Sequence, residues 1–406
     1  MKNDTPLSLE EALDIILSST PSLGTVKVAL RDALGRVLAE DIHADEDLPP
    51  FNNSAMDGYA VIADDTRGAS KDNPRKLKVI AEAPAGTVVT QKIVPGTAVR
   101  IMTGAPVPDG ADTVVMVEDT ESRDGVVLIY HETRSGYNIR PAGEDVKRDE
   151  LVMQTGKRIR PSEMGMLAAL GKAEVTVFRK PRVAIITSGN ELVDASEHPG
   201  PGQIRDSNQY SLFSQVLNVG AEVSVLNRVI DEKEEMERVL SSAVETSDLI
   251  IASGGVSVGD YDFVKETLAK LGDIRFWKVE IKPGKPTVYG SLKGKPLFGL
   301  PGNPVSSMVT FDLFVRPAIM RMMGIESAPY KMVSGAVTQD IRHKLGRREF
   351  IRATTTWSDD GYAVAPAGMQ GSGRLSSMVN ANSYIIVPED MENVAAGEIL
   401  QIMLFE

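Results

Sequence analysis

Apolar runs that are typical of buried strands alternate with helix-like segments over residues 179–326. The strand-like runs read RVAIITSG, AEVSVLNRVI and DLIIASGG, and the segments with apolar residues at helical spacing are 207–217, 231–244 and 262–271. Strands that alternate with helices predict a parallel, doubly wound sheet. The run TVYGSLKGKPLFGL departs from this alternation and predicts a hairpin that turns at Lys293 and Gly294. A long helix is expected to begin at Pro304, because proline fits the first helical turn.

The first 178 residues show a different pattern, with a helix at each end of a β-rich stretch. One helix is expected over 9–18, where Ser8 and Glu11 have the spacing of a capping box, and another over 161–170, ahead of the strand-like run AEVTVF. Between the helices lie short β-branched runs that Gly and Pro separate: LKVIAEA, GTVVTQKIV, TAVRIM and DTVVMVE. These runs predict a β-rich domain inserted into a helical one.

After residue 329 the helical pattern disappears, and short alternating runs with a DDG turn predict a small β-barrel. The runs are VSGAVTQ, EFIRATTTW, YAVAPA, SYIIVP and ILQIMLF. The fold class is therefore multidomain α/β plus β. The expected domains are a discontinuous N-terminal domain (1–50 and 140–178), a β-rich inserted domain (51–139), a central doubly wound α/β domain (179–326) and a C-terminal barrel (327–406).

The composition narrows the classes of function. Of the 406 residues 42% are hydrophobic, and no apolar run reaches the roughly 20 residues of a membrane span. Residues 1–20 lack the pattern of a secretory signal, so we expect a cytoplasmic protein. The formal net charge of -12 argues against nucleic acid as a partner and predicts a local basic pocket for any anionic substrate. Because the chain has no cysteine and its four histidines lack paired spacing, any metal should be a hard, oxygen-liganded one.

Three polar loops follow strands of the expected sheet and should meet at its carboxyl edge. They read TSGNE, SGGVSVGDYD and LPGNP. In the second loop Gly254, Gly255 and Gly259 would let backbone N–H groups approach a phosphate ahead of a helix, with a structural turn as the alternative. Asp260 and Asp262 at its end could each simply cap that helix.

Charged residues in two further segments extend the candidate chemistry. WKVEIKPGKP places Lys278, Lys282 and Lys285 on a stiff stretch that is either an anion site or a solvated basic turn. In the N-terminal part SAMDGYA puts Asp57 before a glycine, as in a plain hairpin turn or a functional carboxylate. RIMTGAP offers the hydroxyl of Thr103 in a tight turn.

Taken in order, eight segments resemble the molybdopterin molybdenumtransferase family, to which bacterial MoeA and the C-terminal part of gephyrin belong. They are SAMDGYA, RIMTGAPVP, AGEDV, TSGNEL, RDSN, SGGVSVGDYD, KPGKP and LPGNPVSS. The resemblance covers nearly the whole chain and implies four domains, the third similar to the molybdopterin-binding fold of the Mog adenylyltransferases. It also implies a homodimer with active sites between chains. The implied reaction inserts molybdate into adenylylated molybdopterin, depends on Mg²⁺, and gives AMP and molybdenum cofactor.

Matching motifs imply the site residues. The catalytic positions are Asp57, Thr103, Asp145, Glu191, Asp231 and Asp262. The substrate-binding positions are Ser188, Gly254, Gly255, Ser257, Gly259, Lys278, Lys282, Lys285, Pro301, Pro304 and Ser372. Glu191, Asp231 and Asp262 would hold Mg²⁺ against the phosphates, since Mg²⁺ prefers oxygen ligands. Asp57 would act as a general base in the other chain's site. Asn190 and Glu232 stand where some relatives carry a second acid and an aspartate, which leaves Glu191 and Asp231 in place.

Two alternative functions are weighed against this one. A Mog-type adenylyltransferase would use the same α/β domain, but the flanking domains and the glycine loop argue against it. A non-enzymatic scaffold like gephyrin is the second, and the occupied acidic positions argue against it. A Mog-type adenylyltransferase and molybdoenzyme chaperones are candidate partners. Molybdate and tungstate are nearly isosteric, so either oxyanion fits this description.

Overall fold

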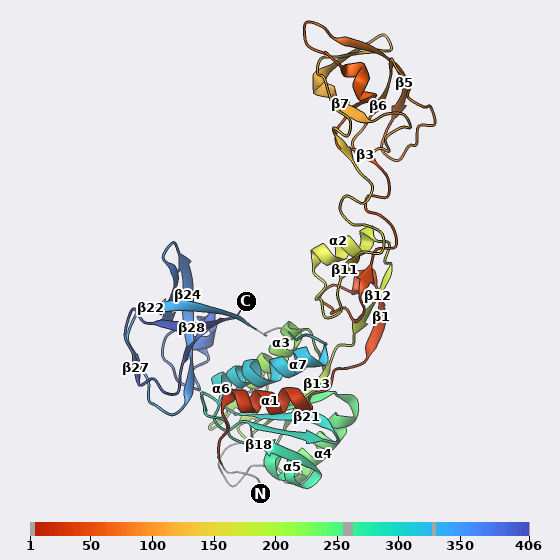
Figure 1. Cartoon of the computed structure of the whole chain (residues 1–406). Coiled ribbons are helices and arrows are strands. Elements are labelled where there is room, and N and C mark those ends of the chain that lie inside the picture. Colours follow the sequence, from red (N-terminus) through yellow and green to blue (C-terminus); the bar gives the residue numbers. More distant parts are fainter. Residues whose placement is uncertain (1–4, 255–262, 327–329, 406) are drawn as a thin grey trace.

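The structure, a computed structural model, describes residues 5–254, 263–326 and 330–405, and only the backbone of 263–266. Figure 1 shows an α/β body with a β-barrel on one side and a long arm on the other, and the arm ends in a β-rich module. Within the described ranges no helix is long and apolar enough to cross a membrane.

A six-stranded sheet with the order β16-β13-β17-β21-β20-β18 forms the centre of the α/β body. Its strands are β13 (Arg182–Ser188), β16 (Glu222–Val229), β17 (Leu249–Ser253), β18 (Gly272–Phe276), β20 (Val288–Leu292) and β21 (Lys295–Leu300). Strands β16, β13, β17 and β21 run parallel, and β20 is antiparallel to both its neighbours. The expected doubly wound parallel sheet is confirmed, with a hairpin strand added near one edge.

Helices cover both faces of this sheet (Figure 1). They are α1 (Leu9–Ser19), α3 (Ser207–Val219), α4 (Lys233–Thr246), α5 (Phe263–Leu271), and a rod made of α6 (Pro304–Thr310), a π-helical turn η4 (Phe311–Val315) and α7 (Arg316–Met322). Alternate residues of β13 face opposite sides. Val183 and Ile185 share a core with α1, α3 and the rod, whereas Ala184 and Ile186 share one with α4. The N-terminal helix α1 therefore packs with the α/β body.

Local signals in the sequence set the starts of several helices. The Ser8 hydroxyl accepts from the Glu11 N–H at 3.2 Å, and the Glu11 carboxylate accepts from the Ser8 N–H at 2.9 Å, which confirms the capping box. Pro304 is the first residue of α6, as expected. Helix α4 starts at Lys233, two residues later than predicted, because the backbone of Glu232 before it is extended, with φ -125° and ψ 132°.

The hairpin between β20 and β21 turns at the expected residues. Lys293 has φ 49° and Gly294 has φ 79°, so both central residues lie in the left-handed region. Two such residues form the turn whose twist matches that of the flanking strands. Lysine is an unusual choice there, and the glycine beside it carries no steric cost.

The arm begins with paired strands and one helix and continues into a narrow neck. Its elements are β1 (Thr25–Ala29), η1 (Leu30–Asp32), β2 (Ile42–His43), β11 (Leu151–Met153), α2 (Pro161–Ala169) and β12 (Glu174–Phe178). In the neck two chain segments run antiparallel, as β3 (Asn53–Ser54) and β10 (Ile139–Arg140). The described chain thus enters the tip module at residue 55 and leaves it at residue 138.

The tip module contains a six-stranded sheet with the order β7-β4-β6-β5-β9-β8. Its elements are β4 (Gly58–Val61), η2 (Ala63–Thr66), β5 (Arg75–Ala83), β6 (Thr97–Ile101), β7 (Thr113–Met116), η3 (Val117–Asp119), β8 (Thr120–Arg123) and β9 (Val126–Ile129). The predicted strand GTVVTQKIV is wrong, because residues 86–94 form turns and irregular chain. Backbone groups at both ends of this segment bond locally, since the Thr87 N–H donates to the Pro84 carbonyl at 3.1 Å and the Val94 N–H to the Thr97 hydroxyl at 3.0 Å.

The C-terminal residues close into a barrel of β22 (Lys331–Val337), β24 (Arg348–Ser358), β25 (Gly361–Pro366), β26 (Ser383–Val387) and β28 (Ile399–Leu404). The ring closes because β24 pairs with both β25 and β26. The predicted barrel is confirmed. Smaller elements are the pair β23 (Ile341–Arg342) and β27 (Asn393–Val394), and helix α8 (Ser376–Val379). A short strand of the α/β body, β19 (Ile281–Lys282), joins this sheet beside β24.

Candidate functional site

The described parts of the three polar loops, which for the second loop are Ser253 and Gly254, meet at the carboxyl edge of the sheet in the α/β body. They follow β13, β17 and β21, which are neighbours and run parallel. The Gly254 N–H donates to the Leu300 carbonyl at 3.3 Å, and a Cβ on Gly302 would lie 3.6 Å from Gly254 Cα. The loops are therefore in direct contact, as the expected topology predicts.

Two side chains from the RDSN segment hold these loops together. Asp206 is buried at the start of α3, where it accepts from the Gln209 N–H at 3.0 Å and from the Thr187 hydroxyl at 2.5 Å. Asn208 donates to the Ser253 hydroxyl at 3.0 Å and to the Gly302 carbonyl at 2.8 Å. Each buried side chain thus joins a loop to α3 or one loop to another.

The sequence-based residue list omitted Asp206 and Asn208. An aspartate three residues before the N–H that it accepts from is the pattern of a helix cap, so the sequence held a signal for Asp206. For Asn208 the pairing spans 45 residues to Ser253 and 94 to Gly302, and only the fold reveals it.

Gly254 allows the close approach of two of the loops. Its φ of 90° lies in the left-handed region, and a Cβ there would come 2.3 Å from the Ser188 carbonyl oxygen. Ser188 itself is buried, and within the described part of the chain its hydroxyl has no hydrogen-bond partner. A buried polar atom of this kind is costly unless a water or ligand satisfies it.

Two predicted acidic residues lie near this edge. Asp231 follows β16, and its N–H donates to the Asn190 side chain at 3.0 Å, which ties it to the TSGNE loop. Its Oδ1 is buried and, among the described residues, unpartnered. Glu191 is exposed, and its carboxylate lies over Gly189. A Cβ on Gly189 would lie 2.7 Å from Oε2 of Glu191. The described residues contain no cluster of three or more acidic or histidine side chains that could hold a metal.

The predicted lysines lie where the α/β body and the barrel join. Lys282 is half exposed and belongs to β19, which pairs with β24 of the barrel. Its Nζ lies 2.8 Å from Oε1 of Glu349, a carboxylate that is only 6% exposed. Lys278 and Lys285 are half-buried and flank the same segment. The barrel therefore fixes the strand that carries Lys282.

Glu349 is in turn backed by a buried histidine. His343 has Nε2 at 3.7 Å from the second oxygen of Glu349, which has no hydrogen-bond partner among the described residues. The two ring nitrogens of His343 face the carbonyls of Met391 at 2.6 Å and Arg347 at 3.0 Å. His343 is thus a structural group behind Glu349.

Three more of the predicted substrate-binding residues, Pro301, Pro304 and Ser372, lie at the junction between the α/β body and the barrel. Pro301 is buried and Pro304 half-buried in the third loop, directly before and at the start of α6. The Val305 N–H donates to the Ser372 carbonyl at 3.1 Å, so a barrel loop covers the start of that helix. Four further predicted residues, Gly255, Ser257, Gly259 and Asp262, lie outside the described residues.

Asp57 and Thr103 lie together at the tip of the arm. Asp57 Oδ1 accepts from the Thr103 N–H and from its hydroxyl, both at 2.7 Å. These two bonds, with a smaller contribution from the Arg100 charge, lower the pKa of the Asp57 carboxyl. Asp57 is exposed, so this ionised carboxylate is open to solvent.

The glycine after Asp57 has a packing role. Gly58 begins β4, where a Cβ would come 1.9 Å from the Val115 carbonyl oxygen of β7. The Asp57-Gly58 pair therefore opens a tightly packed central strand, and the hairpin-turn alternative is wrong. The close packing of β4 against β7 fixes the direction in which Asp57 leaves the sheet.

Within one chain the two groups of predicted residues lie far from each other. Asp57 and Thr103 belong to the tip module, whereas Glu191 and Asp231 lie at the sheet edge of the α/β body (Figure 1). Asp145 is exposed in the neck, where its N–H donates to the Leu48 carbonyl at 3.0 Å. A single chain does not bring these groups together.

Family models match almost the whole chain in three consecutive pieces. Residues 7–171 match the MoeA N-terminal region (domain I and II), residues 184–321 a probable molybdopterin binding domain, and residues 334–405 the MoeA C-terminal region (domain IV). The chain belongs to the MoeA family. The central match agrees with the α/β body, whose sheet edge carries the three loops.

Named relatives of this family align over their full lengths. The molybdopterin molybdenumtransferase of Bacillus subtilis is 36% identical over 410 residues, covering 100% of this chain and 95% of the relative. That of Haemophilus influenzae is 36% identical over 405 residues, covering 98% of each. The crystal structure of the molybdopterin biosynthesis MoeA protein of Pyrococcus horikoshii matches with a TM-score of 0.85 at 34% identity, over 99% of this chain and 100% of that one.

Proposed function

We propose that this chain is a molybdopterin molybdenumtransferase, which inserts molybdate into adenylylated molybdopterin and releases AMP. The observation that carries this proposal is the sheet edge, where Asp206 and Asn208 bond to residues that end β13 and β17 and to Gly302 after β21, and where Asp231 is tied to the first of these loops. Relatives that align over the whole chain bear that name, which supports the same activity here.

The chemistry of such a substrate explains the mixture of charges. Adenylylated molybdopterin and molybdate are both anionic, so binding them together requires nearby cations. Lys278, Lys282 and Lys285 supply positive charge at the junction with the barrel. Glu349 holds the Lys282 ammonium in one place, so less conformational freedom is lost when an oxyanion binds.

The acidic residues fit a magnesium ion that the substrate completes. Mg²⁺ in phosphate sites is usually held by one or two carboxylates together with waters and substrate phosphates. Asp231, with a buried and unpartnered oxygen among the described residues, and the exposed Glu191 match this donor set, and Asp262 is the third proposed ligand. The ion would neutralise charge that develops on the phosphoanhydride oxygens.

We infer that two chains form each site. Asp57 is ionised, solvent-exposed and remote from the sheet edge of its own chain, so it can serve as a general base only in another chain's site. A two-fold homodimer would place each arm tip against the other chain's sheet edge. The Thr103 hydrogen bonds keep the Asp57 carboxylate charged and oriented for that role.

Release of AMP tests the proposed reaction. Purified protein should release AMP from adenylylated molybdopterin only when molybdate and Mg²⁺ are both present. A Mog-type adenylyltransferase would instead consume ATP and molybdopterin, and a scaffold protein would do neither. Competition with tungstate in the same assay identifies the preferred oxyanion. Absence of molybdate-dependent AMP release would refute the proposal.

The cellular setting follows from this function. A cytoplasmic location fits cofactor synthesis, and the substrate would come from a Mog-type adenylyltransferase. The product would pass to molybdoenzyme chaperones, which are the other proposed partners. Co-purification of either partner with the tagged protein from its own cells would support these assignments.

A further inference from the structure

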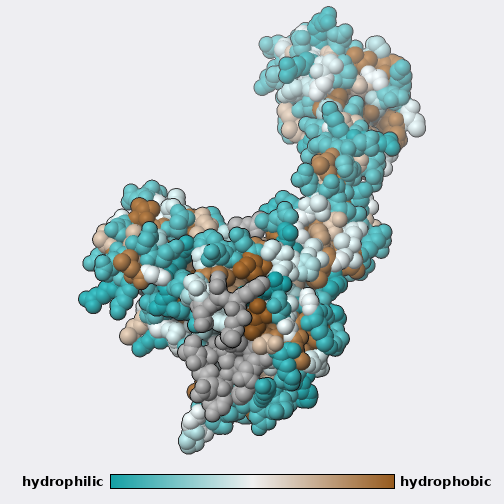
Figure 2. All heavy atoms as spheres, turned by 60° about the horizontal axis from the view of Figure 1, so that its bottom comes forward, coloured by the Kyte–Doolittle hydropathy of each residue, from teal (hydrophilic) through white to brown (hydrophobic). Residues whose placement is uncertain are grey.

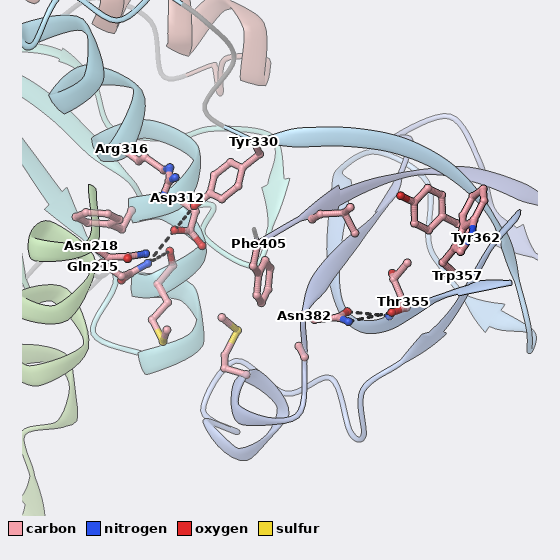
Figure 3. Close-up of a pocket in the computed structure, with 15 residues that line it drawn as sticks. Gln215, Asn218, Asp312, Arg316, Tyr330, Thr355, Trp357, Tyr362, Asn382 and Phe405 are labelled. Atoms are coloured by element: carbon pink, nitrogen blue, oxygen red, sulfur yellow. Dashed lines mark hydrogen bonds between the residues drawn. The ribbon is translucent and has the colours of Figure 1, made fainter. Parts of the chain in front are cut away.

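A cavity lies between the α/β body and the barrel. It has a volume of about 610 Å³ and is lined on one side by α3 and the helical rod and on the other by the barrel. Figure 3 shows Gln215, Asp312 and Arg316 on the helical side, Thr355 and Trp357 on the barrel side, and Phe405 between them. Cavities of this size between domains commonly hold small molecules.

The rod is distorted where it meets this cavity. Residues 311–315 form a π-helical turn, a rare geometry that often marks functional positions. Asp312 in this turn is 9% exposed and accepts hydrogen bonds from Tyr330 at 2.6 Å, Gln215 at 2.9 Å and Tyr384 at 3.0 Å. Burial raises the pKa of the Asp312 carboxyl, which opposes its ionisation. The carboxyl oxygens of Asp312 therefore already accept hydrogen bonds from three uncharged side chains.

Arg316 brings a cation to this side of the cavity, where its charge favours the ionised form of the neighbouring Asp312 carboxyl. Its guanidinium lies 4.4 Å from the centre of the Tyr330 ring, and no carboxylate of the described residues forms an ion pair with it. Its Nε is buried and has no hydrogen-bond partner among the described residues. The Gln215 Oε1 on the facing helix is likewise buried and unpartnered there. Both residues line the cavity, and each has a buried polar atom that no described residue satisfies.

The rest of the cavity is largely apolar. Met308, Phe311, Met378 and Leu404 line it together with Phe405. On the barrel side Trp357 is 68% exposed and packs edge-on against Tyr362, with ring centres 4.7 Å apart. An exposed aromatic pair beside an apolar floor offers surface that a ring-containing ligand can cover.

We propose that this cavity binds an amphipathic organic anion. The acidic group of the ligand contacts Arg316, and an N–H or O–H group of the ligand donates to the Gln215 side-chain oxygen. The apolar rings of the ligand pack against Phe405 and Trp357. The charge of Arg316 selects an acid, and its planar donors suit a carboxylate, sulfonate or phosphate. The unpartnered Gln215 oxygen selects a molecule with an N–H or O–H group near that acid.

This cavity is distinct from the candidate site. The LPGNP loop precedes α6 at one end of the rod, whereas Asp312 lies near the middle of the rod and Arg316 at the start of α7. The proposal depends on neither the molybdate reaction nor a dimer. Because the rod joins both places, occupancy of the cavity can be tested separately from AMP release.

A matched pair of fluorescent probes tests the proposal on the full-length protein. Anilinonaphthalene sulfonate carries a sulfonate, an N–H donor and aromatic rings, and phenylnaphthylamine has the same rings and N–H without the acid. We expect one sulfonate probe to bind per chain, at least about tenfold more tightly than the neutral probe, as for a charge-assisted hydrogen bond. Equal affinities, or binding without a defined stoichiometry, would overturn the proposal.

Variants then locate the probe. Arg316→Gln should reduce the affinity ratio to about one, Arg316→Lys should keep a preference for the sulfonate, and Arg321→Gln, farther along α7 and not among the cavity-lining residues, should leave the ratio unchanged. Trp357→Ala should weaken both probes equally and abolish energy transfer from that tryptophan. If Arg316→Gln lowers the melting temperature, the lysine and Trp357 variants decide the result. Unchanged probe binding in Trp357→Ala would place the probe elsewhere and refute the assignment.

Discussion

The sheet edge of the α/β body and the tip of the arm hold their functional side chains in opposite ways. At the sheet edge, buried Asp206 and Asn208 bond to loop residues that lie up to 94 positions away in the chain. At the tip, exposed Asp57 is held by a single neighbour, Thr103, within the same small module. The first arrangement depends on the whole α/β core, and the second needs only one local sheet.

Because of this difference, we expect the tip module to tolerate removal and the loops at the sheet edge not to tolerate substitution. A module that holds its own carboxylate and joins the rest through a two-segment neck can be moved or removed without disturbing the α/β core. An interlocked set of loops cannot, because each buried polar group loses a partner when another is removed. The following experiments test this contrast.

Excision of the tip module should give the largest effect. Ser54 and Ile139 are paired residues of β3 and β10, so an Asn-Gly turn can join them in place of residues 55–138. We expect AMP release to disappear while the thermal unfolding of the remaining body keeps its midpoint. Calorimetry and the AMP assay measure the two quantities. A large fall in the midpoint would show that the tip supports the core, against this contrast.

Complementation between two single variants should come next. Asp57→Ala and Glu191→Gln should each lower AMP release by about 100-fold or more, as for loss of a general base or a metal ligand. In a mixed dimer with inter-chain sites, one site carries both lesions and the other none. Random reassortment makes about half of the dimers mixed, so activity should return to about a quarter of wild type.

Differential tags on the two chains verify that mixed dimers form. Asp57→Ala mixed with Asp57→Ala serves as the control and should stay inactive. Purified mixed dimers that remain inactive would mean that Asp57 and Glu191 serve a site within one chain, which contradicts the remote positions that they occupy here.

Substitutions in the two regions should also differ in their effect on the free energy of unfolding, although this effect is smaller than the changes in activity. Asn208→Ala removes the donor to Ser253 and Gly302 inside the interlocked loops, and we expect a loss of about 2–3 kcal/mol. Asp57→Asn, at an exposed position, should change stability by less than about 0.5 kcal/mol. Urea unfolding followed by circular dichroism compares them. Similar losses in both variants would remove the contrast.

The smallest expected effect is a shift in pH dependence. Hydrogen bonds from Thr103 lower the Asp57 pKa, and Thr103→Val removes the hydroxyl bond but keeps the backbone one. The pKa of Asp57 should rise, so the acidic limb of kcat/KM should move to higher pH, with no change above neutrality. A limb that stays in place would mean that another group controls it. Thr97→Val, elsewhere in the tip sheet, is the control.

Much of the fold followed from local chemistry that a reader of the sequence can recognise. The Ser8 and Glu11 capping box, the Lys293-Gly294 turn and the Pro304 helix start depend on residues within a few positions of each other. The carboxyl-edge meeting of three loops also followed, because parallel strands end at one edge. The strand expected over residues 86–94 was wrong, since β-branched residues favour a strand but do not supply a partner strand, and the ends of this segment bond locally.

The motifs, their order and the residues proposed to hold anions or magnesium can be read from the sequence, because these depend on side-chain chemistry. Three other features became visible only in the folded chain. Lys282 pairs with Glu349, which lies 67 residues later in the chain, and Asn208 joins two loops. Arg316 lines a cavity that the barrel also lines. Such pairings join segments distant in the chain. Their partners are set by how the sheet, rod and barrel pack, and no local pattern encodes that packing.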